Sequence, residues 1–125
     1  MDTLANSLNS LKIAEKMKKK NTAIKPASKL LGAVLNIFKE EGYIQGFDAK
    51  PESNEYVVSL KGSINECGAI KPRFAVKKDA WERYELRYLP AREIGTLVVA
   101  TSQGLMPHEK AKEKGLGGRL ICFIY

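Results

Sequence analysis

The apolar run at residues 120–125, LICFIY, is the feature that most constrains the fold. A strand with one face in water alternates apolar and polar side chains, whereas an uninterrupted apolar run needs cover on both faces. Residues 96–100, TLVVA, form a second apolar β run upstream of it. We therefore predict that the two runs pair, with residues 120–125 as a central or covered strand.

A small polar turn, residues 101–104 (TSQG), directly follows the first of these runs. Pro107 suits the first turn of a short helix that ends near Lys114, and the glycine pair at 117–118 precedes the final run. The order strand, polar turn, helix, strand predicts one compact unit. The side chains of the turn either form hydrogen bonds with its own backbone at the start of the helix, or the turn presents its hydroxyls and backbone to a partner. Both interpretations stay open.

The N-terminal segment predicts an amphipathic helix, because apolar residues recur at helical spacing from Leu4 to Ala14. Asp2 or Thr3 is placed to cap it. A lysine cluster, residues 16–20 (KMKKK), follows at the far end. These lysines either form a solvated face that complements the helix C-terminus or contact phosphates.

The next segment alternates between strand and helix signals. Thr22–Lys25 predicts a short strand, and Ser28 can cap a second helix whose broad apolar stripe ends before Gly42. Tyr43–Phe47 and Tyr56–Leu60 predict a hairpin pair joined by a polar stretch. The predicted N-terminal order is therefore αβαββ.

A turn-rich segment, Gly62–Gly68, predicts a boundary between two lobes. The basic residues 71–78 follow in a strand or extended loop. Asp79–Arg87 then predicts a helix, and the spacing of the aromatic residues there indicates that their rings pack in the core. The fold class we expect is α+β with two small lobes. Residues 1–66 form the αβαββ lobe, and residues 67–125 form a mixed β lobe with short helices.

The net charge of +7 and the isoelectric point near 9.4 favour a polyanionic partner. The positive charge is concentrated in two blocks: residues 1–29 hold seven lysines against two acids, and residues 71–92 hold seven basic side chains against three acids. No apolar run has the length needed to span a membrane. A structured RNA is the partner that these charges and the hydroxyl-rich turn favour.

Catalytic signals are absent. Nucleophilic catalysis needs a base beside the nucleophile, and the single histidine, His108, is predicted to be an exposed helix residue. Cys67, in a predicted turn, and Cys122, in a strand, have neither disulfide nor zinc spacing, which favours a reducing, intracellular setting. No glycine-rich nucleotide motif occurs. We predict no enzyme activity, no metal, no cofactor and no small-molecule substrate.

The strand, TSQG turn, short helix, glycine pair and terminal strand of residues 96–125 resemble the C-terminal signature of the universal small-ribosomal-subunit protein eight family. PASKL at 26–30 and EEGYI at 40–44 extend the resemblance over nearly the whole chain. Residues 64–92 look like the archaeal and eukaryotic branch. Bacterial members usually carry an acidic residue where this chain has Arg119, so a carboxylate contact there is not carried over.

The resemblance implies a cytoplasmic constituent of the small ribosomal subunit that directly binds a helical stem of small-subunit ribosomal RNA and supports subunit assembly. Neighbouring small-subunit ribosomal proteins would be its other partners, with no membrane involved. A nucleic-acid-binding regulatory domain or a membrane-peripheral basic protein outside the ribosome is the alternative. The motif assigns RNA contact to the 101–104 turn, and the charge blocks add phosphate contacts. The residues predicted to contact RNA are Thr101, Ser102, Gln103, Gly104, Lys18, Lys19, Lys20, Lys71, Arg73, Lys77, Lys78, Gly117 and Gly118.

Overall fold

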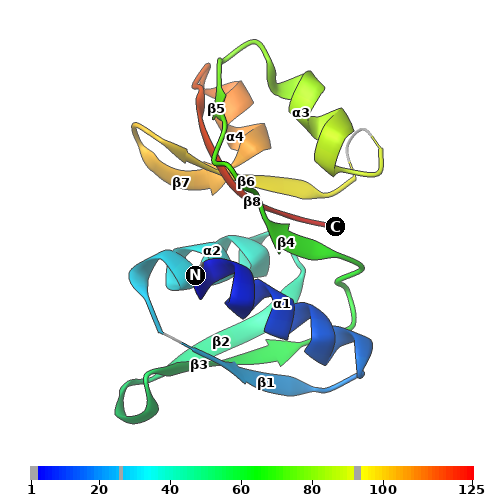
Figure 1. Cartoon of the computed structure of the whole chain (residues 1–125), viewed down its shortest axis with the longest axis vertical. Helices are drawn as coiled ribbons and strands as arrows, with labels where there is room; N and C mark the ends of the chain where they lie inside the picture. Colours follow the sequence, from blue (N-terminus) through cyan, green and yellow to red (C-terminus); the bar gives the residue numbers. More distant parts are fainter. Residues whose placement is uncertain (1–2, 26, 92–93) are drawn as a thin grey trace. The chain divides into compact units, whose positions relative to one another are not determined.

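A computed structural model describes residues 3–25, 27–91 and 94–125 of the chain (Figure 1). The chain divides into two compact units, Met1–Cys67 and Gly68–Tyr125, which we call the N-terminal and C-terminal units. Both combine helices with antiparallel strands, so the predicted α+β class is confirmed.

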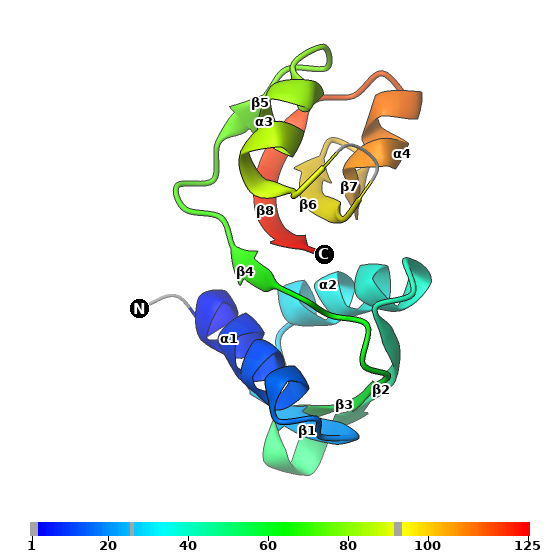
Figure 2. The same ribbon diagram turned by 90° about the vertical axis from the view of Figure 1, so that its right-hand side faces the viewer.

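The N-terminal unit has the predicted order αβαββ. Its elements are α1 (Thr3–Lys16), β1 (Asn21–Ile24), α2 (Lys29–Glu40), β2 (Ile44–Lys50), the 3-10 turn η1 (Pro51–Ser53) and β3 (Glu55–Leu60). The three strands form an antiparallel sheet in the order β1-β3-β2. Figures 1 and 2 show α1 and α2 on the same face of this sheet. Their apolar stripes, including the fully buried Leu8, Leu11 and Phe38, therefore form one core with the sheet.

Local signals account for the ends of these elements. Ser28 caps α2, since its hydroxyl oxygen accepts a hydrogen bond from the Leu31 N–H at 3.1 Å, as predicted. The cap predicted for α1 falls partly outside the described residues: Asp2 is not among them, and Thr3 is already the first helical residue. Strand β2 runs on to Lys50, beyond the predicted end at Phe47, because an exposed strand edge tolerates polar side chains.

The C-terminal unit is organised around its last strand. The sheet contains β4 (Cys67–Ala69), β5 (Ala75–Val76), β6 (Thr96–Thr101), β7 (Gly104–Pro107) and β8 (Gly118–Ile124). Their order is β4-β8-β6-β7, with β5 also paired to β8. The prediction of a central C-terminal strand beside 96–100 is confirmed, and Leu120, Cys122 and Ile124 have no exposed surface.

Two helices, α3 (Trp81–Tyr88) and α4 (His108–Glu113), pack on this sheet (Figure 2). Trp81 from α3 and Ala111 from α4 belong to one buried cluster with Leu97, Val99 and Leu120. The predicted core role of the aromatic helix is confirmed for Trp81, which is almost completely buried.

Two local predictions are wrong. The 101–104 turn does not lead into a helix: it joins β6 to β7, a strand that sequence analysis missed, and forms the tip of an antiparallel hairpin. Cys67 does not lie in a turn but begins β4, with only 3% of its surface exposed. Burial raises the pKa of its thiol to about 12, which keeps the thiol protonated and unreactive.

Candidate nucleic-acid interface

Strand register brings several predicted RNA-binding residues to one end of the C-terminal sheet. Because β8 is antiparallel to both β6 and β5, its first residues lie beside the end of each of those strands. Arg119 of β8 pairs with Ala100 of β6 on one side and with Ala75 of β5 on the other. We call this region the basic end of the sheet. It comprises residues 77–78, 101–104, 114 and 117–119.

The hairpin tip is shaped by the hydroxyl of Thr101. Its Oγ1 donates to the Gly104 carbonyl at 2.9 Å and accepts from the Gln103 N–H at 3.1 Å. Gly104 has a φ of +102°, a conformation that side chains with a Cβ rarely adopt. Thr101 and Gly104 therefore stabilise the turn itself. This structural role accounts for both residue types at these positions without any contact to RNA.

Ser102 is the residue of the turn that is open to a partner. Its side chain is exposed, and its hydroxyl makes no hydrogen bond to any residue that the structure describes. The hydroxyl can both donate and accept a hydrogen bond. Of the four predicted turn residues, Ser102 is thus the strongest candidate for direct contact.

A lysine that sequence analysis missed lies beside the tip. Lys114, just after α4, donates from Nζ to Oε1 of Gln103 at 3.2 Å. The sequence pattern predicts Lys114 only as the end of the short helix. β7 leads away from the tip as it pairs with β6, and α4 then returns the chain so that Lys114 lies beside Gln103.

The glycine pair has a packing role. A Cβ on Gly118 would lie 2.5 Å from the Ala100 carbonyl oxygen, and a Cβ on Gly117 would overlap the Val76 carbonyl and approach the Lys78 nitrogen at 3.2 Å. Both residues are therefore needed for the close approach of the strands beside β8. Their contact with RNA stays a prediction.

Most of the predicted basic residues of this unit are exposed near the same end. Lys77 and Lys78 follow β5, and Arg73 precedes it. Nη1 of Arg119 donates to the Arg73 carbonyl at 3.2 Å, which adds a second cation that sequence analysis did not assign. Lys71 lies further along β8, since the preceding residue bonds through its N–H to the Ile121 carbonyl.

A buried polar group ties α3 and α4 to the sheet. Nδ1 of His108 accepts the Leu97 N–H at 3.0 Å, and its Nε2 lies 3.3 Å from Oε1 of Glu85. Nζ of Lys112 donates to the same oxygen at 2.6 Å. His108 is only 3% exposed, so the prediction of an exposed residue is wrong. Burial lowers the pKa of His108, which favours the neutral ring that this geometry requires.

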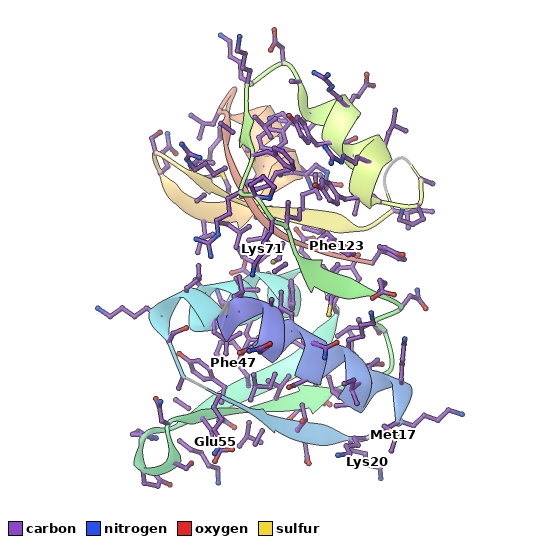
Figure 3. The ribbon with its side chains drawn as sticks, in the orientation of Figure 1. Met17, Lys20, Phe47, Glu55, Lys71 and Phe123 are labelled. Carbon is purple, nitrogen blue, oxygen red and sulfur yellow. The ribbon has the colours of Figure 1, made fainter. Side chains whose placement is uncertain are left out.

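The remaining predicted lysines, Lys18, Lys19 and Lys20, belong to the N-terminal unit, and their backbone is firmly held. The Lys19 N–H bonds to the Ala14 carbonyl and the Lys18 N–H to the Glu15 carbonyl, both at 3.1 Å, which is a Schellman cap of α1. The Leu60 N–H bonds to the Lys20 carbonyl at 2.8 Å. Figure 3 labels Met17 and Lys20 at this end of α1. The side chains are exposed on a fixed backbone.

Comparison with known families gives one finding. The family model for ribosomal protein S8 matches residues 2–125. The chain belongs to the ribosomal protein S8 family. The family predicted from the sequence is confirmed, and its archaeal and eukaryotic branch stays a prediction.

Membership in the ribosomal protein S8 family makes the chain a small-subunit ribosomal protein of a kind that binds ribosomal RNA and other ribosomal proteins. The family is not enzymatic. Among the residues that the structure describes, no group of three histidine, cysteine or acidic side chains could hold a metal ion. No helix in that part of the chain is long and apolar enough to cross a membrane.

Proposed function

We propose that the chain binds a helical stem of small-subunit ribosomal RNA directly, through the basic end of the C-terminal sheet, and thereby supports assembly of the subunit. The observation that carries this proposal is the exposed Ser102 hydroxyl, which has no bonding partner in the described structure and stands at a fixed hairpin tip among cations. Residues 67–125 are accordingly the RNA-binding lobe.

The chemistry of an RNA stem fits this arrangement. The minor groove of A-form RNA is wide and shallow and displays 2′-hydroxyls and base edges, which a narrow hairpin tip can reach. We infer that exposed cations near the tip contact the flanking phosphates, namely Lys77, Lys78, Lys114 and Arg119. Phosphate contacts supply affinity and orientation, whereas the hydroxyl supplies selectivity.

A footprint of the purified protein on small-subunit ribosomal RNA, with Ser102→Ala as the variant, tests the proposal. We expect one protected stem and a loss of about 1–3 kcal/mol of binding free energy on substitution, the scale of an unsatisfied buried polar partner. Ser53→Ala is the matched control, since Ser53 is an exposed serine of the N-terminal unit. Equal affinity of Ser102→Ala and the wild type would refute the assignment.

Competition experiments separate this function from its alternatives. Duplex DNA and anionic vesicles are added as competitors of the protected stem at fixed salt, because the basic blocks attract any polyanion. We expect the protein to remain bound to the RNA stem in the presence of either competitor. Displacement by either competitor at equal phosphate concentration would favour a nucleic-acid-binding regulatory domain or a membrane-peripheral protein.

A further inference from the structure

The exposed side of α3 presents an arginine whose side chain is held by two aromatic rings. The Cζ atom of Arg87 lies 4.9 Å from the centroid of the Phe74 ring and 5.4 Å from the centroid of the Tyr88 ring. Arg87 is exposed, and it forms no ion pair or hydrogen bond with any residue that the structure describes. The ring contacts therefore position the guanidinium, while its N–H donors stay available to another molecule.

The two rings are themselves held in place. Phe74 and Tyr88 both pack against the buried cluster of the C-terminal unit. Phe74 also contacts Tyr84, with ring centroids 6.1 Å apart, and Tyr88 stacks with Phe123 at 6.0 Å and an interplanar angle of 25°. Because the guanidinium rests on rings that are already ordered, a ligand that binds it loses less conformational entropy than one that binds a free arginine side chain.

Two further exposed residues of α3 adjoin Arg87. Arg83 precedes Leu86 by three positions and Arg87 by four, so it is a neighbour of both on the helix surface. Leu86 exposes 70% of its surface, an unusual position for a large apolar side chain. Like charges four positions apart on a helix repel each other, and an anion bound between Arg83 and Arg87 would relieve this repulsion. We call Arg83, Leu86 and Arg87 the α3 surface.

We propose that the α3 surface binds an acidic segment of a partner protein, in which a carboxylate accepts paired hydrogen bonds from the Arg87 guanidinium and an apolar side chain covers Leu86. Charge complementarity determines the sign of the partner, since neither Arg83 nor Arg87 has an ion-pair partner among the described residues. The planar fork of a guanidinium matches the two oxygens of a carboxylate. Arginine is also one of the residue types enriched in protein interfaces.

The composition of the α3 surface favours a protein over RNA. Leu86 gains from contact with an apolar side chain, whereas a ribose-phosphate backbone offers it only polar groups. Glu82 is exposed four positions before Leu86, and its negative charge repels phosphate. The rings of Phe74 and Tyr88 carry the guanidinium over their faces, so those faces are not free to stack on a base. The α3 surface also shares no residue with the basic end of the sheet.

Selection of short random peptides on the full chain tests the proposal without assuming a partner sequence. We expect the enriched peptides to combine aspartate or glutamate with apolar residues. The most enriched peptide is then titrated into isotope-labelled protein, and the amide signals of Leu86 and Arg87 together with the Nε–H signal of Arg87 report binding. Absence of enrichment, enrichment of basic peptides, or binding that leaves these signals unshifted overturns the proposal.

Variants of the α3 surface give the second readout. Arg87→Ala and Leu86→Ser should each weaken binding of the selected peptide about tenfold, the scale expected for a central interface residue. Arg87→Lys keeps the charge but loses the planar fork, so it should weaken binding as well. Lys39→Ala is the matched control, because it removes an exposed positive charge from α2 of the other unit and should leave the affinity unchanged. Equal affinity of Arg87→Ala and the wild type overturns the proposal, and larger shifts of the same signals with oligouridylate than with the peptide overturn it in favour of RNA.

Discussion

Replacement of Lys18 by glycine should make the protein more stable and a weaker RNA binder. Lys18 occupies the position after α1 that helices most often fill with glycine, and its φ of +59° lies in the left-handed region. For a residue with a Cβ this conformation costs about 1–2 kcal/mol. We therefore expect glycine at this position to stabilise the fold and to remove a side chain that we predict contacts phosphate.

The magnitude follows from two opposing effects. Glycine relieves the left-handed strain of about 1–2 kcal/mol, but it also gives the unfolded chain more freedom, which costs about 0.4–1 kcal/mol. The expected net gain in the free energy of unfolding is about 0.5–1 kcal/mol. In thermal unfolding of a domain of this size, that corresponds to an increase in Tm of about 2–5 °C.

The predicted loss of RNA binding is measured by titrating small-subunit ribosomal RNA at several salt concentrations. Each lysine that neutralises a phosphate contributes about 0.7–0.9 to the slope of log affinity against log salt. We expect Lys18→Gly to flatten the slope by up to this amount. Asn54→Gly is the control, because Asn54 also has a left-handed backbone, with a φ of +54°, but lies in the turn before β3. It should leave the salt slope unchanged.

Two outcomes would refute the reasoning. A decrease in Tm for Lys18→Gly would show that the left-handed conformation carries no strain at this position. An increase in Tm together with an unchanged salt slope would show that the lysine is solvated and does not touch phosphate. Only a gain in stability combined with a loss of salt dependence supports a binding role.

Three further predictions concern the C-terminal unit. Gly118→Ala should lower the free energy of unfolding by about 1–3 kcal/mol in urea titrations, because its Cβ would meet the Ala100 carbonyl; an unchanged midpoint would contradict the packing role. Burial keeps the folded-state pKa of His108 below its ordinary value of 6.5, so the unfolded chain binds more protons and stability should fall as pH drops below about 6.5. Urea midpoints at pH 7.5 and 5.5 measure this effect, which His108→Gln should reduce. Deletion of Phe123–Tyr125 should abolish cooperative folding of this unit and RNA binding together, and a truncated protein with wild-type Tm and affinity would contradict the central place of β8.

Elements with strong local patterns could be predicted from the sequence. The αβαββ order of the N-terminal unit followed from apolar spacing, and the start of α2 followed from Ser28, whose capping bond depends on residues three positions apart. The central position of β8 followed from six apolar residues in succession. In each case the information lay within a few residues of the element itself.

Features that depend on contacts between distant segments could not be predicted. Strand β7 contains only two apolar residues, Leu105 and Met106, between a glycine and a proline. This pattern is too short to indicate a strand, whereas Pro107 favours the start of a helix. His108 stands in the charged sequence HEKAKE, while the partner that buries it, Glu85, lies on another helix. The basic end of the sheet gathers its residues through strand register, which no local pattern of this chain specifies.

The central place of β8 also has a consequence for folding during synthesis. β8 follows the other four strands of its sheet along the chain, and among the described strands β4 and β5 each pair with β8 alone. The N-terminal sheet is complete once β3 has emerged, so that unit can fold while the rest of the chain is still being translated. Before β8 is synthesised, the β6–β7 hairpin is the one strand pairing available to the described strands of the second unit, and an isolated hairpin is at best marginally stable. We therefore expect the nascent chain to acquire the proposed RNA-binding surface late and in one step, after the first unit has folded.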